Sequence, residues 1–473
     1  MIKLELIGNE FKYELENVIQ LFYPEQKISA DEGEFLKITA AVKNDEAVIE
    51  VEAGEKNYKR SQNYIVGDAE RTLCELLFLI LKEHSKITPE WGIQTGVRPV
   101  KLLRNLAKIH GEKQARDILK DRFLISDTKL KLASDVDNIQ KPYLSMLSDD
   151  TFSLYISIPF CRSRCSYCSF ISHDVSKSAK LMPEYVELLV REIEYTANIT
   201  KQLGLKLKTV YFGGGTPTAL TAEQLKDICD AVSRCFDLSG VLEYTIEAGR
   251  PDTVTEEKLR VIKSAGAGRI SINPQTLNDN VLKAVHRKHT VEEFYTAYNA
   301  ARHIGFDCIN TDLIAGLPSD DLCSFCHSLD GVMDIAAENI TVHTLSIKRS
   351  SSLVYRNTAQ YDAVGNTVSD MLGYAQKKLP LFGYVPYYMY RQSRMAGNNE
   401  NIGWSKPGKE SLYNIFIMEE VQTIIALGAG ASTKLVKDGS IERIFNYKYP
   451  YEYIRGFDEI LKRKDGIYEF FEN

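Results

Sequence analysis

Between residues 151 and 348, short apolar runs alternate with longer stretches whose apolar residues recur at helical spacing. Short apolar runs predict buried strands, and amphipathic stretches predict helices. The predicted strands are 154–159, 208–212, 243–247, 269–273, 308–314 and 340–347. The predicted helices are 183–200, 222–235, 255–265, 291–304 and 320–337.

This alternation predicts a parallel sheet, because parallel strands need crossover connections and helices supply them. Six strands suit a partial barrel, so we expect an α/β fold built on a partial (β/α)6 TIM-like parallel barrel. In such barrels the active site lies at the carboxyl ends of the strands, where the connecting loops gather. Side chains with chemical roles are therefore expected just after the predicted strands.

The segments that precede the barrel are patterned differently. Residues 1–90 predict a small α/β domain, and residues 91–150 predict a mostly helical connector. The elements expected in the small domain are strands at 1–7, 35–42 and 47–52 and a helix at 71–83.

After residue 348 the regular alternation ends. Residues 349–473 are rich in tyrosine and glycine, with a strand predicted at 383–388. We expect 349–473 to form a separate C-terminal α+β region that faces the substrate or covers it as a lid.

The composition narrows the class of protein. Of the 473 residues, 44% are hydrophobic and 26% are charged, and the net charge of −6 gives no basic field for nucleic acid. The amino terminus lacks the basic-then-apolar build of a signal peptide, and no apolar run approaches the length of a membrane span. We expect a cytoplasmic protein that binds neither nucleic acid nor membranes.

Three cysteines, Cys161, Cys165 and Cys168, follow the first predicted barrel strand with C-x3-C-x2-C spacing. Thiolates are soft ligands that suit iron-sulfur clusters, and three of them leave one iron of a 4Fe-4S cluster without a protein ligand. Buried structural cysteines or a zinc site are the alternatives. Zinc sites usually pair C-x2-C with a second ligand pair, and the sequence has no matching pair.

Another cysteine pair, Cys323 and Cys326, precedes His327 in the C-x-x-C-H spelling of a haem attachment site. These residues fall in a predicted amphipathic helix, so we interpret the spelling as coincidence. Single cysteines elsewhere in apolar patterns are expected to be small buried hydrophobes.

Consecutive glycines, 213–215, end the second predicted strand and precede Thr216-Pro217-Thr218. Glycines allow a ligand to approach the backbone and leave its amide groups free to bind it. The segment lacks the lysine of a P-loop, which argues against a triphosphate site. Next to a three-cysteine loop it suggests a ligand that reaches the open iron.

These motifs together resemble the radical S-adenosylmethionine superfamily. The match lies within its oxygen-independent coproporphyrinogen III oxidase group, in the HemZ-type branch of coproporphyrinogen dehydrogenases. The cluster motif runs from Tyr155 to Cys168, and the glycines match the methionine-binding loop. The branch is suggested by the Trp91-Gly-x-x-Thr-Gly-x-Arg98-Pro segment, by Glu247-Ala-Gly-Arg-Pro-Asp and by Gly428-Ala-Gly-Ala-Ser432.

The resemblance implies a 4Fe-4S cluster on Cys161, Cys165 and Cys168 and one or two S-adenosylmethionine molecules. With Tyr155, these cysteines would be the catalytic set. The implied S-adenosylmethionine contacts are Tyr155, Tyr167, Gly214, Gly215, Thr216, Glu247, Gln275, Arg287 and Asp312.

Several of these contacts have structural alternatives. Arg287 could be a solvated charge at a helix end, and Glu247 and Asp312 could pair with structural arginines. Tyr167 could pack the loop instead of stacking beside the adenine.

The implied reaction is the oxidative decarboxylation of two propionates of coproporphyrinogen III to vinyl groups, which gives protoporphyrinogen IX. A 5'-deoxyadenosyl radical would abstract hydrogen, and an electron donor such as flavodoxin or ferredoxin would reduce the cluster. Ser157 and Phe170 depart from the best characterised members, and related haem chaperones also have phenylalanine at the second position. A haem chaperone and a radical enzyme for another tetrapyrrole therefore stay open.

A tetrapyrrole with four carboxylates needs local cations, because the whole chain is acidic. Candidates are Lys348, Arg349, Arg391 and Arg394, with Trp404 as part of a flat aromatic pocket. Solvated surface charge is the alternative for each cation. Arg98 and Lys101 suggest at most a lid or a contact for the electron donor.

Overall fold

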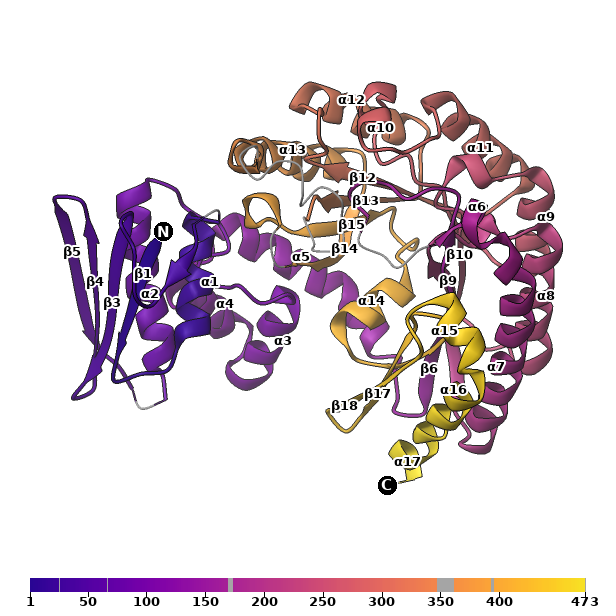
Figure 1. Cartoon of the computed structure of the whole chain (residues 1–473), viewed down its shortest axis with the longest axis horizontal. Helices are drawn as coiled ribbons and strands as arrows, with labels where there is room; N and C mark the ends of the chain where they lie inside the picture. The colour runs from indigo at the N-terminus through magenta and orange to yellow at the C-terminus, as the bar shows by residue number, and fades with distance from the viewer. Residues whose placement is uncertain (25, 66, 169–172, 347–360, 393–394, 473) are drawn as a thin grey trace. The chain divides into compact units, whose positions relative to one another are not determined.

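The computed structural model describes residues 1–24, 26–65, 67–168, 173–346, 361–392 and 395–472. The chain forms two compact units, which Figure 1 shows in colours that follow the sequence. The first contains Met1–Asp137 with Tyr355–Ser369 and Tyr390–Glu400. The second contains Asn138–Val354, Asp370–Met389 and Asn401–Asn473. The first unit thus extends past residue 90 into the expected connector.

The first unit contains a five-stranded sheet of order β2-β1-β3-β4-β5. Its elements are β1 (Ile2–Ile7), α1 (Lys12–Phe22), β2 (Ile28–Ser29), β3 (Leu36–Lys43), β4 (Glu46–Ala53), β5 (Lys56–Asn63) and α2 (Ala69–Ser85). Alternate side chains of β3 and β4, such as Ile38 and Ile49, share a core with Leu77 of α2. The predicted elements of this domain are confirmed. The pattern does not reveal β5, because its residues are polar and almost all exposed.

Three helices follow this sheet, which confirms the helical character expected for residues 91–150. They are α3 (Pro99–His110), α4 (Glu112–Asp121) and α5 (Asp127–Leu144). Proline opens α3 at its first position, where its missing N–H has no helical partner to lose.

The second unit is built on an eleven-stranded sheet of order β14-β15-β13-β12-β11-β10-β9-β6-β16-β17-β18. Its central strands are β6 (Thr151–Ile158), β9 (Lys206–Gly214), β10 (Glu243–Glu247), β11 (Arg269–Ser271), β12 (Cys308–Ala315) and β13 (Asn339–Thr344). Each is parallel to its neighbour in this series. The predicted α/β fold with a partial parallel barrel is therefore confirmed.

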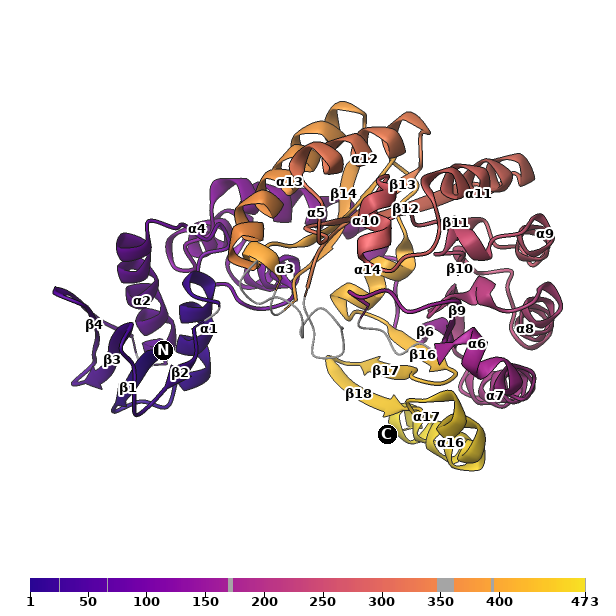
Figure 2. The same cartoon turned by 45° about the horizontal axis from the view of Figure 1, so that its top comes forward.

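Helices connect these strands and cover one face of the sheet. They are α7 (Met182–Gln202), α8 (Ala222–Cys235), α9 (Glu256–Ser264), α10 (Asp279–Ala284), α11 (Val291–Ile304) and α12 (Leu322–Asp334). In Figures 1 and 2, α7, α8, α9 and α11 follow one another along the outside of the barrel strands. Capping boxes at Thr221 and Thr290 fix the starts of α8 and α11. No helix in the described parts of the chain is long and apolar enough to span a membrane.

The carboxyl-terminal part of the chain adds strands to both edges of the barrel sheet. Its elements are α13 (Tyr361–Leu381), β14 (Val385–Tyr390), β15 (Asn401–Ser405), α14 (Leu412–Glu419), β16 (Thr423–Leu427), β17 (Ser432–Lys437), β18 (Ser440–Phe445), α15 (Pro450–Arg455), α16 (Phe457–Lys464) and α17 (Gly466–Glu472). Strand β15 pairs antiparallel with β13, and β16 pairs parallel with β6.

The expectation that residues 349–473 form a separate region is therefore wrong for these strands. All five residues of β16 are buried, and its sequence Thr-Ile-Ile-Ala-Leu is mostly apolar. Such a strand needs partners on both sides, and the open edge at β6 provides one.

Candidate functional site

The cysteine loop follows β6 at the carboxyl end of the first barrel strand, as predicted. Cys161 ends the short strand β7 (Phe160–Cys161), which pairs with β8 (His173–Asp174). The side chains of Cys161 and Cys165 are buried, and Cys168 is partly buried. In the described residues, no three His, Cys, Asp or Glu side chains converge closely enough to hold a metal ion.

Arg250, which follows the carboxyl end of β10, holds this loop through hydrogen bonds. Its Nη1 donates to the carbonyl oxygen of Ser163 at 2.8 Å and to Ser163 Oγ at 3.0 Å. Its Nε and Nη2 donate to the two carboxylate oxygens of Asp252, each at 3.0 Å. Burial alone would raise the pKa of Asp252, but Arg250 outweighs it and lowers that pKa. The sequence showed Arg250 only as part of a family segment, not as a support of the loop.

Arg287 is a buried cation beside the same loop, so the alternative of a solvated helix-end charge is wrong. Its guanidinium donates to Tyr167 Oη at 3.1 Å, to the Asn273 carbonyl at 2.7 Å and to Cys165 Sγ at 3.9 Å. It also donates to the Gly249 carbonyl and to His289 Nδ1. None of these partners in the described chain is a carboxylate. A buried cation without a counter-charge is costly, so this position favours an anion.

Glu247 ends β10 and presents the opposite charge. In the described chain its carboxylate has one hydrogen-bond partner, the hydroxyl of Tyr211, and no cation pairs with it. Burial raises the pKa of Glu247 to about 7, Tyr211 opposes this rise and the negative charge of Asp312 adds to it. The alternative that Glu247 pairs with a structural arginine is not found among the described residues. This carboxylate favours a cationic ligand group.

Asp312 and Gln275 lie at the ends of the next strands and contact each other through the backbone. The amide N–H of Gln275 donates to the Asp312 carbonyl at 2.9 Å. The Asp312 carboxylate accepts from Asn273 Nδ2 at 2.7 Å and from Asn310 Nδ2 at 2.8 Å. Burial would raise the pKa of Asp312, but hydrogen bonds from His343 and Asn310 lower it. Gln275 has a left-handed φ of 70°, and its buried Oε1 has no partner among the described atoms, so it is available to a donor.

The glycine segment lies against the cysteine loop because it has no side chains. A Cβ on Gly215 would stand 2.6 Å from the Phe160 carbonyl oxygen, and Gly214 has a left-handed φ of 106°. The Gly215 N–H donates to the Ile158 carbonyl at 2.7 Å. Thr216 Oγ1 lies 3.3 Å from Cys161 Sγ. The two motifs that the sequence placed on adjacent strands thus form one site.

A stack of three tyrosines forms the floor beside Glu247. The rings of Tyr211 and Tyr413 are 4.3 Å apart, and Tyr155 stacks on both at 6.2 and 6.0 Å. The sequence singled out Tyr155 alone, since Tyr413 lies on α14, far along the chain. In the described chain, the ring of Tyr167 packs against apolar residues such as Ile314 and not against another aromatic ring. Its contact with adenine stays a prediction.

Ser157, one of the two departures from the best characterised members, fastens the C-terminal glycine segment to the site. Its Oγ donates to the Ala429 carbonyl at 2.8 Å, and its own carbonyl accepts from Tyr185 Oη at 2.8 Å. Glu192 accepts from the Gly428 N–H at 2.8 Å. The segment 428–432 is therefore held at the end of β6. The other departure, Phe170, lies outside the described residues.

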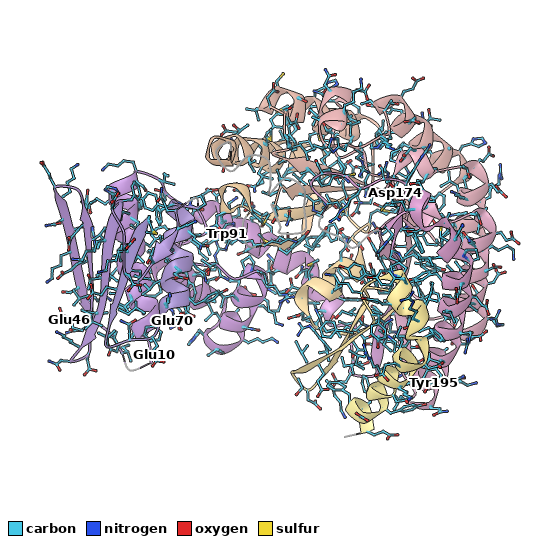
Figure 3. The ribbon with its side chains drawn as sticks, viewed as in Figure 1. Glu10, Glu46, Glu70, Trp91, Asp174 and Tyr195 are labelled. Carbon is cyan, nitrogen blue, oxygen red and sulfur yellow. The ribbon has the colours of Figure 1, made fainter. Side chains whose placement is uncertain are left out.

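Of the cations expected to bind the substrate, the structure describes Arg391. Arg391 belongs to the first unit, where its guanidinium donates to the carbonyls of Gln94 and Asn398 and lies 5.4 Å from the Trp91 ring. Trp91, labelled in Figure 3, donates to Glu400 at 2.7 Å. Burial lowers the pKa of Arg391 to about 10. The Trp91 segment therefore has a structural role within its own unit.

The role of the remaining expected substrate residues stays a prediction. Lys348, Arg349 and Arg394 lie outside the described residues. Trp404 is buried within β15. Arg98 and Lys101 stand at the start of α3, in the first unit.

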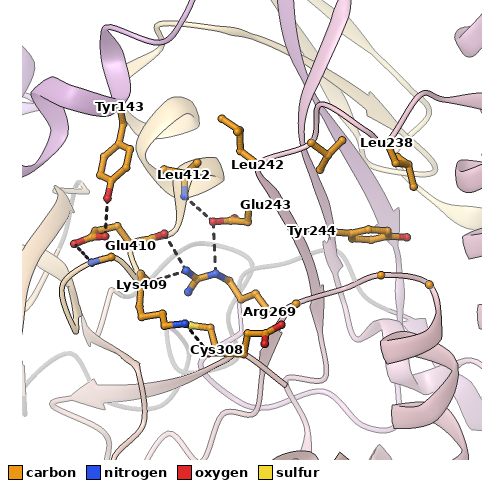
Figure 4. Close-up of a pocket in the computed structure, with 16 residues that line it drawn as sticks. Tyr143, Leu238, Leu242, Glu243, Tyr244, Arg269, Cys308, Lys409, Glu410 and Leu412 are labelled. Atoms are coloured by element: carbon orange, nitrogen blue, oxygen red, sulfur yellow. Dashed lines mark hydrogen bonds and ion pairs between the residues drawn. The ribbon is translucent and has the colours of Figure 1, made fainter. Parts of the chain in front are cut away.

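A cavity of about 490 Å³ lies at the opposite, amino-terminal end of the barrel strands (Figure 4). Glu243, Arg269 and Cys308, the first residues of β10, β11 and β12, contribute to its lining. Arg269 Nη2 donates to the carbonyls of Lys409 and Glu410 at 2.6 and 2.9 Å. None of the predicted site residues lines this cavity.

Comparisons with known proteins agree with the geometry. Residues 155–330 match the model of the Radical SAM superfamily. The chain is 38% identical over 99% of its length, and 98% of the relative's, to the oxygen-independent coproporphyrinogen-III oxidase-like protein HemZ of Bacillus subtilis. It is 32% identical over 59% of its length, and 70% of the relative's, to the heme chaperone HemW of the same organism.

A solved structure shares the fold. Coproporphyrinogen III oxidase (HemN) from Escherichia coli matches with a TM-score of 0.53 and 22% identity, over 68% of this chain and 72% of that one. Membership of the superfamily implies a 4Fe-4S cluster and S-adenosylmethionine, and the buried thiols with unmatched charges beside them fit both. From its cysteine loop, its partial barrel and its full-length similarity, the chain belongs to the radical S-adenosylmethionine superfamily and, within it, to the HemZ-type branch of oxygen-independent coproporphyrinogen-III oxidase-like proteins.

Proposed function

We propose that the protein is a radical S-adenosylmethionine enzyme that converts propionates of coproporphyrinogen III to vinyl groups, giving protoporphyrinogen IX. The observation that carries this proposal is the pair of buried charges, Glu247 and Arg287, which have no oppositely charged side chain beside them in the described chain; Arg287 also contacts Cys165. Together they complement the ammonium and carboxylate of an amino acid. S-adenosylmethionine carries such a group in its methionine part.

In this proposal Cys161, Cys165 and Cys168 hold the cluster. Glu247 accepts the ligand ammonium, Arg287 donates to its carboxylate, and the free Oε1 of Gln275 accepts from a further donor. The segment Gly214, Gly215 and Thr216 lets the ligand approach the cysteine loop closely. Asp312 adds a further polar group to the wall of the site. The bound cofactors supply one-electron chemistry that forms a carbon-centred radical.

Tyr155 is proposed to serve as part of the aromatic floor. Its ring stacks on Tyr211 and Tyr413, so the end of β6 is apolar next to the polar charges. Burial and the charge of Glu247 raise the pKa of Tyr155, so its hydroxyl stays protonated. A neutral, tightly packed wall excludes water from a radical reaction.

The test is anaerobic incubation of the reconstituted protein with coproporphyrinogen III, S-adenosylmethionine and dithionite. We expect vinyl products and methionine to accumulate together. A fully loaded cluster that cleaves S-adenosylmethionine without any vinyl product would refute the substrate assignment. A cytoplasmic location and flavodoxin or ferredoxin as the electron donor stay predictions.

A haem chaperone is the second candidate, favoured by the similarity to HemW. It predicts stoichiometric haem binding without turnover of S-adenosylmethionine. A third candidate, a radical enzyme acting on another tetrapyrrole, predicts consumption of haem but not of coproporphyrinogen III. Adding haem and coproporphyrinogen III in separate anaerobic reactions distinguishes the three.

A further inference from the structure

Two buried guanidinium groups approach the same thiol in the cysteine loop. Nη1 of Arg250 and Nη1 of Arg287 each lie 3.9 Å from Cys165 Sγ. The arginines come from different connections, after β10 and after α10. Cys161, by contrast, has the neutral hydroxyl of Thr216 beside its sulfur. Two buried positive charges therefore lie beside the Cys165 position.

The two arginines differ in what else they do. Arg287 is itself assigned to the carboxylate of S-adenosylmethionine. The other side-chain partners of Arg250 in the described chain belong to the cysteine loop or to its own turn. Arg250 donates to Ser163 on one side and forms a two-pronged ion pair with Asp252 on the other. The side chains of Arg250 and Asp252 are 4% and 3% exposed. Their geometry is thus fixed in a setting with little water to screen the charge.

We propose that Arg250 is a positioning residue for the cysteine loop and raises the reduction potential of the cluster held there; this inference rests on the proposed function. Reduction adds one electron, and so one negative charge, to the cluster. A nearby cation and an N–H aimed at a ligand sulfur stabilise the reduced form more than the oxidised form. The weak dielectric screening of a buried site strengthens this difference.

Asp252 limits the effect of Arg250, because its negative charge is held 3.0 Å from the guanidinium. It also fixes the direction in which Nη1 points. Arg162 contacts Asp252 from outside, with its Nη1 at 2.6 Å from the Asp252 carbonyl, but its side chain is 60% exposed. Solvent screens Arg162, so Arg250 carries the effect on the cluster.

The test is a redox titration, followed by electron paramagnetic resonance, on full-length protein reconstituted with iron and sulfide under anaerobic conditions. Dithionite supplies the single electron. In Arg250→Gln we expect the equilibrium constant for cluster reduction to fall about tenfold, which corresponds to a potential lower by about 59 mV. Arg250→Lys keeps the charge and should lie between Arg250→Gln and the wild type.

Asp252→Asn provides a shift of opposite sign. It removes the negative charge but leaves the donors of Arg250 on Ser163, so the potential should rise above that of the wild type. It also keeps the test available should Arg250→Gln fail to fold. Arg260→Gln is the matched control, because Arg260 is 65% exposed in an α9 ion pair and its loss should leave the potential unchanged.

The outcomes separate this inference from the proposed function. If the wild type binds no cluster, the proposed function fails. If the variants load normally and their potentials equal that of the wild type, the inference is overturned while the function stands. A loss of iron in Arg250→Gln with an unchanged potential in the loaded fraction would show a purely structural arginine and also overturn the potential claim.

Discussion

The two ends of β10 carry a glutamate each, and the protein treats them differently. At the amino end, Glu243 lies 3.5 Å from Arg269 and accepts a hydrogen bond from Leu412 N at 2.7 Å (Figure 4). It also accepts one from Ser411 Oγ at 2.9 Å. At the carboxyl end, Glu247 has one hydrogen-bond partner in the described chain, Tyr211. One strand thus carries a glutamate with a counter-charge at its amino end and a glutamate without one, among the described residues, at its carboxyl end.

We interpret this difference as one between a charge that serves the fold and a charge that serves a ligand. The ion pair of Glu243 with Arg269 is formed within the chain, so folding alone compensates its burial. In the proposed function, the charges of Glu247 and Arg287 are left for a ligand to match, at a cost to the stability of the ligand-free protein. On this proposal, the buried charges without a counter-charge lie at the functional end of the barrel, and the cavity lies at the other end.

The largest expected effect comes from removing a cluster ligand. Cys165→Ala should abolish the brown colour, the bound iron and the cleavage of S-adenosylmethionine, because two thiolates cannot replace three. Iron analysis and product chromatography measure this. The matched control is Cys308→Ala at the amino-terminal end, which should keep the cluster. Full iron content in Cys165→Ala would refute the cluster site.

Removing the charge of Glu247 should weaken ligand binding without harming the fold. In Glu247→Gln we expect the affinity for S-adenosylmethionine to fall roughly 100-fold, because the ligand ammonium loses its buried counter-charge. The thermal stability of the ligand-free protein should stay equal or increase. Anaerobic calorimetric titration and thermal unfolding give the two quantities.

Glu243→Gln at the other end of β10 should show the reverse pattern. It leaves Arg269 buried without its carboxylate, so unfolding should become easier by about 3 kcal/mol while the affinity for S-adenosylmethionine is kept. Equal losses of stability in both variants would remove the distinction between the two ends.

The raised pKa of Glu247 predicts a pH dependence of the ligand-free protein. A buried acid with a folded-state pKa of about 7 binds its proton more tightly in the folded state than in the unfolded state. Stability is then highest below the unfolded pKa and falls as the pH rises toward 7. The total effect is on the order of 3 kcal/mol. Glu247→Gln should remove this part of the stability profile.

The affinity for S-adenosylmethionine should also depend on the ionisation of Glu247, but it should increase with pH where the stability decreases. Its ammonium prefers the ionised carboxylate, so affinity should increase by up to about tenfold per pH unit as the pH rises toward 7. Asp312 contributes a second negative charge nearby, but its lowered pKa keeps it ionised in this range. A flat affinity profile in the wild type would contradict the role given to Glu247.

The smallest effect is expected at the C-x-x-C-H segment. Cys323 is exposed and Cys326 is partly buried, and both lie on helix α12. This agrees with the interpretation that the match to a haem attachment motif is a coincidence. Cys323→Ser should leave iron content, stability and activity unchanged. Intact mass should show no haem adduct, and an adduct in the wild type would reverse this interpretation.

Much of the barrel could be predicted because its signals are local. Strand β10 and helices α8 and α11 have the predicted bounds, since apolar spacing and caps such as Thr221 act within a few residues. The cysteine loop and the glycines are local motifs too.

The tertiary structure decided the pairings that join distant parts of the chain. Strand β16 completes the sheet beside β6, although no sequence pattern records which edge it will find. Tyr413 reaches the stack on Tyr155 in the same way, from a helix far along the chain.

The sequence alone therefore determined that Cys161, Cys165 and Cys168 form a three-thiol loop at the carboxyl end of a parallel strand, because spacing within one loop is a local property. Only the tertiary structure showed that Arg250 and Arg287 converge on Cys165 and that no cation among the described residues pairs with Glu247. The balance of a buried charge depends on every group around it. Those groups come together only when the chain folds.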